Sequence, residues 1–209
     1  MDQKKLNIIY FADPMCSTCY GFSPSISKIM NDQEGLVEVQ MIMGGLRPFN
    51  TETMKDLSAF LQKEWQKVEQ LSGQYFKYDL LANHSFVYDT EPACRAVITM
   101  RRVAPEFTFH YFKALQKAFY SENKDITDTT TLIELTEEFD INHEVFKKEF
   151  VSQNLRLITL NEFNYSSKIG ISSFPTIGIQ KREQINILAK GFINAKELIE
   201  QYILELKIE

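Results

Sequence analysis

Two cysteines separated by two residues are the part of this sequence best suited to chemistry. Cys16 and Cys19 lie in DPMCSTCYGF, between an apolar run and a segment with helical periodicity. Such a pair can bind a metal, form a permanent disulfide or exchange disulfides reversibly. At the start of a helix, unpaired backbone N–H groups and the helix dipole stabilise a thiolate at Cys16. Cys19, one turn further along, is expected to be buried and to resolve a mixed disulfide at Cys16.

A structural zinc site is the main alternative for this pair. Such a site usually has four cysteine or histidine ligands, and the motif supplies two. The other candidates, Cys94, His84, His110 and His143, are scattered over the middle of the chain. The sequence contains no second CxxC and no HxxxH pair. We therefore expect no metal site.

Composition limits the class of protein. The 209 residues are 44% hydrophobic and 12% aromatic, which indicates a globular chain. The net charge of -5 and the lack of a basic block argue against a nucleic-acid partner. No stretch approaches the roughly 18 apolar residues of a membrane span, and the N-terminus does not resemble a signal peptide. We expect a cytoplasmic protein without a membrane partner. In that reducing compartment, a CxxC is more often redox-active or metal-binding than a permanent bridge.

The pattern of apolar residues predicts an α/β fold. We expect a strand, a helix, a strand, a block of helices, another helix, a hairpin of two strands and a final helix capped by Asn194. Thr90 and Asp128 are expected to cap helices of the block. The corresponding ranges are 5–12, 17–32, 37–43, 51–150, 151–168, 175–180 with 185–190, and the residues after 194.

These elements predict one mixed four-stranded sheet. The first two strands need the helix between them as a crossover and so pair in parallel, whereas the hairpin is antiparallel. The helical block then interrupts the sheet domain as an insertion. We divide the chain into a first part of the sheet domain, 1–48, an all-helical insertion, 49–150, and a second part of the sheet domain, 151–209.

A second motif lies in SSFPTIGI, where Pro175 begins a strand. Proline lacks an N–H and is tolerated at the first residue of a strand. The Phe174–Pro175 peptide bond can be cis or trans, and the sequence leaves both open.

Together, YFADPMCSTCYGF, the helical insertion with DTEPACRAV and GISSFPTIGI resemble the DsbA-like branch of the thioredoxin superfamily, most closely its cytoplasmic FrnE-like proteins. The resemblance implies a thioredoxin-like fold and thiol–disulfide exchange. Cys16 becomes the nucleophile, Cys19 the resolving thiol and Pro175 a cis-proline. The Phe174 backbone pairs with an extended substrate, with Thr176 completing the motif. Partners are then protein or low-molecular-weight disulfides, with glutathione or another cellular thiol as reductant, and no cofactor beyond the cysteine pair.

One departure from the resemblance lies between the cysteines. Many relatives have tryptophan there, whereas this chain has Ser17 and Thr18. Their hydroxyls can hydrogen-bond the Cys16 sulfur and shift its reduction potential, because about 30 mV corresponds to only about 1.4 kcal/mol. Reductase, oxidase and isomerase therefore all stay open, as do a monomer and a homodimer.

Two other functions share this scaffold. Kappa-class glutathione transferases and hydroxychromene-carboxylate isomerases resemble it too, but usually have serine at the position of Cys16. A non-catalytic adapter that delivers a client to a protease is the third hypothesis, and an intact CxxC argues against it without excluding it.

Other residues have both a structural and a functional interpretation. Cys94 is expected to be an inert, half-buried thiol, with a third redox thiol as the alternative. Asp13 is expected to shape the turn before the motif, and it could also act electrostatically on the cysteines. Met15, Tyr20 and Phe22 are candidates for an exposed apolar contact around the nucleophile.

Overall fold

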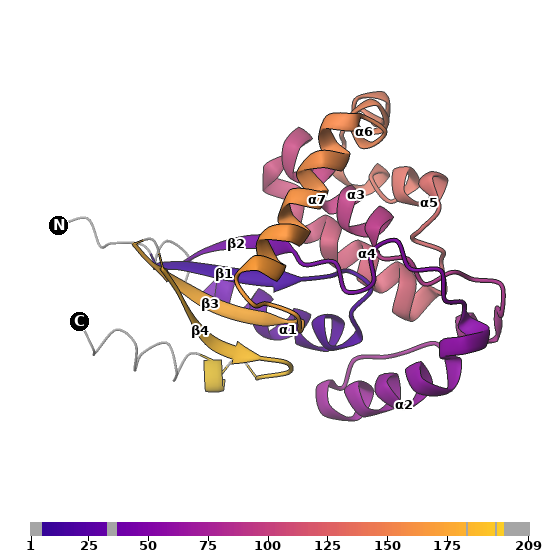
Figure 1. The fold of residues 1–209 in the computed structure, drawn as a ribbon, viewed down its shortest axis with the longest axis horizontal. Helices are drawn as coiled ribbons and strands as arrows, with labels where there is room; N and C mark the ends of the chain where they lie inside the picture. Colours follow the sequence, from indigo (N-terminus) through magenta and orange to yellow (C-terminus); the bar gives the residue numbers. More distant parts are fainter. Residues whose placement is uncertain (1–5, 33–36, 183, 195, 199–209) are drawn as a thin grey trace.

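The computed structural model describes residues 6–32, 37–182, 184–194 and 196–198, and it forms a mixed sheet flanked by helices (Figure 1). The strands are β1 (Leu6–Ala12), β2 (Val37–Met43), β3 (Thr176–Lys181) and β4 (Gln184–Lys190). Their order is β2-β1-β3-β4, with β1 parallel to β2 and the other neighbours antiparallel. The predicted thioredoxin-like α/β fold is therefore confirmed.

The central strand β1 is covered on both faces, which explains its unbroken apolar sequence. The Tyr10 ring packs against Phe22 of helix α1 (Ser17–Asp32) and Phe112 of helix α4 (Thr108–Glu122). The Phe11 ring stacks on Tyr165 of helix α7 (Gln153–Lys168). Successive side chains of a strand point to opposite faces, so adjacent residues of β1 meet different helical layers. The site is thus built on a strand buried from both sides.

Helices make up most of the rest of the chain. The structure contains α1 (Ser17–Asp32), α2 (Met54–Ser72), η1 (Asp79–Ala82), α3 (Glu91–Val103), η2 (Pro105–Phe107), α4 (Thr108–Glu122), α5 (Thr129–Glu134), η3 (Glu137–Phe139), α6 (His143–Phe150) and α7 (Gln153–Lys168). Residues 73–90 are an exception to the predicted helical block: they hold one short 3-10 helix, and Val87 forms an isolated bridge with Thr53. The division at residues 48 and 150 stays a prediction.

Two of the three predicted caps are observed. The Asp128 side chain accepts the N–H of Thr131 at 3.0 Å, and that of Asn194 accepts the N–H of Glu197 at 2.9 Å. Thr90 precedes α3, but its hydroxyl accepts the N–H of Arg47 at 3.1 Å instead of capping the helix. The predicted final helix falls mostly outside the described residues.

An aromatic cluster joins α1 to the insertion. The ring of Tyr20 lies 4.9 Å from that of Tyr120 and 5.1 Å from that of Phe76, and Trp65 packs against both partners. The prediction that Met15, Tyr20 and Phe22 are exposed is wrong, because these side chains are 0%, 7% and 0% exposed. The insertion covers the side of α1 from which that contact was expected.

A buried ion pair lies within α3, and its arginine also contacts α6. The Arg95 guanidinium binds Glu91 through two hydrogen bonds of 2.7 and 3.1 Å, and donates a third to the Phe150 carbonyl at 2.7 Å. The guanidinium carbon of Arg95, Cζ, lies 4.0 Å from the centre of the Phe150 ring. Both charges are about 95% buried, so each needs the other to offset its lost hydration.

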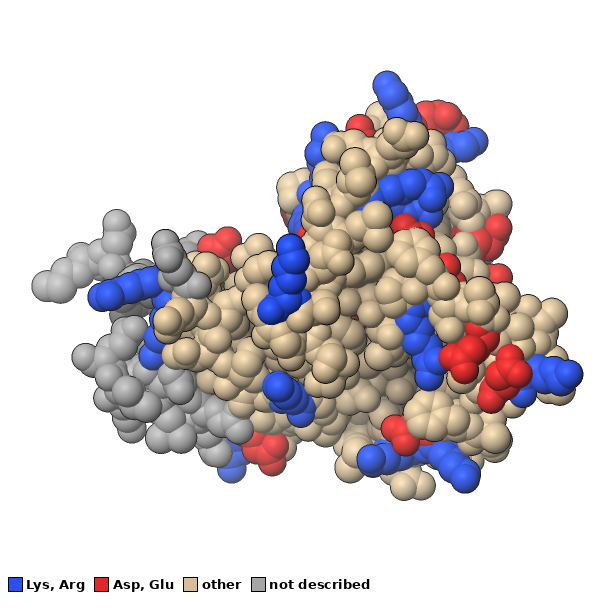
Figure 2. Space-filling model, viewed as in Figure 1, with Lys and Arg blue, Asp and Glu red and all other residues tan. Residues whose placement is uncertain are grey.

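Surface charges are mixed in sign. On the face shown in Figure 2, basic and acidic side chains are interspersed without a continuous basic patch. In the part of the chain that the structure describes, every helix is too short or too polar to cross a bilayer.

The Glu91–Arg95 pair gives a stability prediction. We expect Glu91→Ala to lower the free energy of unfolding by about 3–5 kcal/mol, because it leaves the Arg95 charge buried and unpaired. The double variant Glu91→Ala/Arg95→Met is expected to regain part of this loss, since it removes that charge. Urea unfolding followed by circular dichroism measures both. A double variant as unstable as the single one would contradict the argument.

Candidate active site

Cys16 occupies the position that caps α1. The turn Asp13–Met15 follows β1, and the Cys16 carbonyl accepts the N–H of Tyr20 at 3.0 Å, the first hydrogen bond of the helix. The N–H of Cys19 points at the Cys16 sulfur, with 3.4 Å between nitrogen and sulfur. Polar N-cap side chains accept a backbone N–H in the same way. The sulfur therefore faces a positive helix end, as the motif predicts.

The second motif meets the first at this sulfur. The Phe174–Pro175 bond is cis, and the Cys16 thiol donates to the Phe174 carbonyl at 3.2 Å. Thr176 belongs to β3, is fully buried and donates to the Ser173 carbonyl at 2.7 Å, so its side chain closes this turn. Residues 158 positions apart are thus in direct contact.

Ser17 and Thr18 are half-buried in the first turn of α1. Their hydroxyls make no hydrogen bond to the Cys16 sulfur in this structure, where the Cys19 amide and the Phe174 carbonyl are its polar partners.

The two cysteines differ in exposure. Cys16 is 4% exposed and Cys19 is 0% exposed, and both thiols are free. Burial, and then the neighbouring Cys16, raises the pKa of the Cys19 thiol well above its ordinary value. Cys19 is therefore protonated, as a thiol, in this structure. The order in which Cys16 reacts first and Cys19 resolves stays a prediction.

A buried carboxylate supports the turn before the cysteines. Asp13 accepts the N–H of Met15 at 2.8 Å through one oxygen, and the N–H of Leu46 at 2.6 Å and the Cys94 thiol at 3.3 Å through the other. Asp13 therefore shapes the turn as predicted and also links it to α3 and to the segment after β2. Burial raises the pKa of the Asp13 carboxyl, which outweighs the lowering by these hydrogen bonds.

Three site residues escaped the sequence analysis or were only partly anticipated. Cys94 is fully buried rather than half-buried, and burial raises its pKa. The buried Tyr88 hydroxyl donates to the Met15 carbonyl. Gly44 contacts the Phe174 ring so closely that a Cβ at this position would lie 1.9 Å from it. Cys94 was already a candidate in the sequence, and Gly44 belongs to a glycine pair that follows a predicted strand, whereas Tyr88 had no signal.

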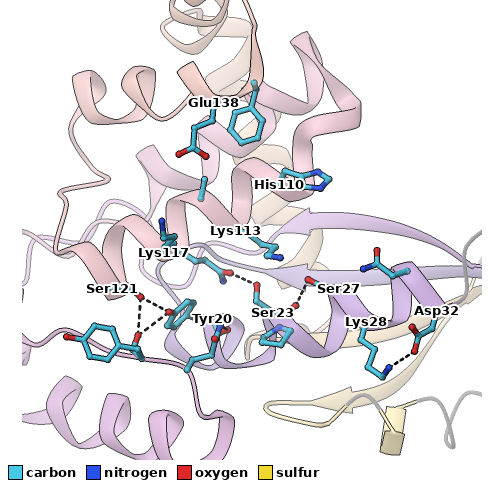
Figure 3. A pocket seen from close by; sticks show the side chains of 17 residues that line it. Tyr20, Ser23, Ser27, Lys28, Asp32, His110, Lys113, Lys117, Ser121 and Glu138 are labelled. Carbon is cyan, nitrogen blue, oxygen red and sulfur yellow. Dashed lines mark hydrogen bonds and ion pairs between the residues drawn. The ribbon is translucent and has the colours of Figure 1, made fainter.

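A groove lies beside α1, with Tyr20 of the cysteine motif in its lining. It has a volume of about 880 Å³ and runs between α1 and α4. Figure 3 shows Tyr20 and Ser23 of α1 opposite Lys113 and Lys117 of α4, and neither cysteine lines it. Among the described residues, no group of three or more His, Cys, Asp or Glu side chains could hold a metal ion.

Comparison with known proteins gives the family. The model of the thioredoxin family matches residues 10–200. The chain belongs to the thioredoxin family. This thioredoxin-family protein is 30% identical to a candidate protein disulfide isomerase from Nitrosomonas europaea, with a TM-score of 0.92 over 99% of this chain and 100% of that one. The predicted thioredoxin-superfamily resemblance is confirmed, and its DsbA-like, FrnE-like branch stays a prediction.

Two further relatives are more distant. The cytosolic disulfide reductase DsbM from Pseudomonas aeruginosa is 24% identical, with a TM-score of 0.80 over 97% of this chain and 98% of DsbM, and a DsbM structure with GSH gives 0.77. The ClpXP adapter protein SpxH from Bacillus subtilis is 25% identical over 84% of this chain. The match spans 58% of the length of SpxH.

The raised pKa of Asp13 gives a test of its burial. The folded protein holds this proton more tightly than the unfolded chain, so the stabilisation is complete below pH 3.8 and is lost as the pH rises through the raised value. In Asp13→Asn this dependence disappears. We expect the free energy of unfolding of the wild type, minus that of the variant, to fall between acid and neutral pH.

Urea unfolding at several pH values measures this difference, and Asp56→Asn is a control of opposite sign. The hydrogen bonds from Thr53 lower the pKa of the exposed Asp56, so the corresponding difference should rise with pH. A difference for Asp13 that stays constant or rises would mean that its carboxyl is not destabilised by burial.

Proposed function

We propose that this protein is a thiol–disulfide oxidoreductase that uses Cys16 as nucleophile and Cys19 as resolving thiol. One observation carries the proposal: the Cys16 sulfur caps α1, between the Cys19 amide at 3.4 Å and the Phe174 carbonyl at 3.2 Å. A thiolate at this position is stabilised by the helix end, and an extended chain can approach beside Phe174.

The reaction requires two exchanges. The Cys16 thiolate attacks one sulfur of a substrate disulfide, that S–S bond breaks, and the leaving sulfur takes up a proton. Cys19 then loses its proton and attacks the Cys16 sulfur, which releases the second substrate thiol and leaves a Cys16–Cys19 disulfide. Two molecules of a low-molecular-weight thiol reduce this disulfide and become oxidised to their own disulfide.

Phe174, Pro175 and Thr176 hold the substrate in this proposal. While Cys16 is a thiol, it donates to the Phe174 carbonyl. Once Cys16 has ionised, that carbonyl is available to accept an N–H from an extended substrate, as in strand addition. Ser17 and Thr18 flank the sulfur and contact the incoming chain.

We further propose that glutathione or a similar thiol is the reductant and that no cofactor is needed beyond the cysteine pair. The GSH in one DsbM structure supports a small thiol as partner. A cytoplasmic location agrees with this chemistry, because reducing thiols are abundant there.

Substitution of each cysteine tests the mechanism. We expect Cys16→Ser to abolish glutathione-driven reduction of insulin disulfides, because it removes the nucleophile. Cys19→Ala should accumulate a mixed disulfide at Cys16, visible by mass spectrometry as a shift that a reductant reverses. Cys94→Ala is the control thiol and should retain turnover. Normal turnover by Cys16→Ser would exclude the proposal.

A second candidate is a protein adapter, which the match to SpxH favours. An adapter needs its docking surfaces and not its thiols. If the adapter function is the physiological one, a Cys16→Ser/Cys19→Ser protein should restore a deletion strain as fully as the wild type. If disulfide exchange is the physiological function, the same variant should not restore the deletion strain, although its circular dichroism spectrum shows a normally folded protein.

A further inference from the structure

The groove between α1 and α4 is formed by two helix faces that lie opposite each other (Figure 3). On α1, Tyr20, Ser23 and Ser27 recur every three or four residues, so they share one face of that helix. Lys113 and Lys117 share a face of α4 for the same reason. The short serine side chains leave space between the helices, and the groove has a volume of about 880 Å³. Sites for small organic molecules typically have volumes of about 300–1,000 Å³.

A buried amide with an unused donor lines this groove. Gln116 of α4 is 0% exposed, although it belongs to the lining. Its side-chain oxygen accepts the Ser23 hydroxyl at 2.6 Å, whereas its side-chain nitrogen has no hydrogen-bond partner among the described residues. A buried donor without a partner lowers stability, and such groups are uncommon in folded proteins. A ligand in the groove that offers an acceptor atom to Gln116 would satisfy this donor.

A basic side chain beside this amide has no ionic partner. Lys113 precedes Gln116 by three residues on α4, so the two side chains lie next to each other on that helix. The Lys113 ammonium forms no ion pair with any residue that the structure describes. Its recorded contact is with the ring of Phe109, and the distance from Nζ to the ring centre is 5.9 Å. Lys113 is therefore available to an anionic group in the groove.

The other charges of the groove are close to charges of opposite sign. Lys28 pairs with Asp32 at 2.7 Å, and Lys117 pairs with Glu122 at 2.9 Å. Glu138, the second acidic residue of the lining, lies on the Lys117 side of the groove (Figure 3). The unbalanced positive charge is thus that of the lysine next to the buried amide.

We propose that this groove binds a small organic anion, whose carboxylate or phosphate group lies between the Lys113 ammonium and the side-chain nitrogen of Gln116. An anionic oxygen suits both groups, because it accepts the amide N–H and pairs with the ammonium. The groove is much larger than an inorganic ion, so the ligand also has an organic body, which packs beside Pro24 and Ala114. Neither cysteine lines the groove, and the inference does not depend on disulfide exchange.

Matched probe molecules test the requirement for an anion. Adenosine monophosphate carries a phosphate and naphthoate a carboxylate, and adenosine and naphthol are their uncharged counterparts. Inorganic phosphate is the anion without an organic body. Binding to the full chain is measured by the shifts of backbone amide signals in NMR spectra. We expect at least one of the two organic anions to shift signals of α1 and α4, with an affinity about tenfold above those of its uncharged counterpart and of inorganic phosphate.

Substitutions at the two proposed anchoring groups test the position of the site. Lys113→Glu should weaken the binding of that anion about tenfold, and Gln116→Leu should weaken it by a similar factor, because it removes the buried donor. Lys113 is exposed, so its variant is expected to fold even if the loss of the Ser23 partner destabilises Gln116→Leu. Lys63→Glu is the matched control, since it makes the same change of charge at an exposed position of α2, outside the groove. It should retain the wild-type affinity within about twofold.

Each of the opposite outcomes would overturn the proposal. If neither organic anion shifts signals of α1 and α4, the groove does not bind this class of ligand. If an anion and its uncharged counterpart bind equally, the charge is not recognised. Equal weakening by Lys113→Glu and Lys63→Glu would indicate an effect of net charge alone. Inorganic phosphate that binds as tightly as the organic anions would mean an adventitious ion only.

Discussion

The first turn of α1 has backbone N–H groups that no preceding carbonyl can satisfy, and the Cys16 sulfur is placed to accept one of them. This arrangement places the Cys16 sulfur at the helix end and leaves the other sulfur, that of Cys19, buried as a thiol. The chemistry proposed for the protein follows from that asymmetry. It requires that β1 end, that the chain turn within four residues and that α1 begin at a fixed angle to the sheet.

Asp13 holds this turn in one conformation. A fully buried carboxylate is costly unless it is hydrogen-bonded, and this one accepts three donors from three different segments. The same bonds fix the distance between the cysteine turn, α3 and the segment after β2. Asp13 thus connects the cysteine turn to both neighbouring segments, and the raised pKa of its carboxyl is the energetic cost of its burial.

The helical insertion covers one side of α1. Its aromatic rings pack on Tyr20, and Met15, Tyr20 and Phe22 are all buried. The exposed apolar contact expected from these three residues is therefore absent.

Local patterns were enough to predict the strands, most helices, the mixed sheet and the position of Cys16 at a helix start, because apolar periodicity and helix-end chemistry depend on residues close along the chain. The folded chain alone reveals that Asp13 meets Cys94, that Gly44 makes room for Phe174 and that Arg95 is paired in the core. The burial of Met15 was also not predictable from the sequence. Contacts between distant segments, and the water that they exclude, depend on how whole elements pack, and no local pattern encodes that packing.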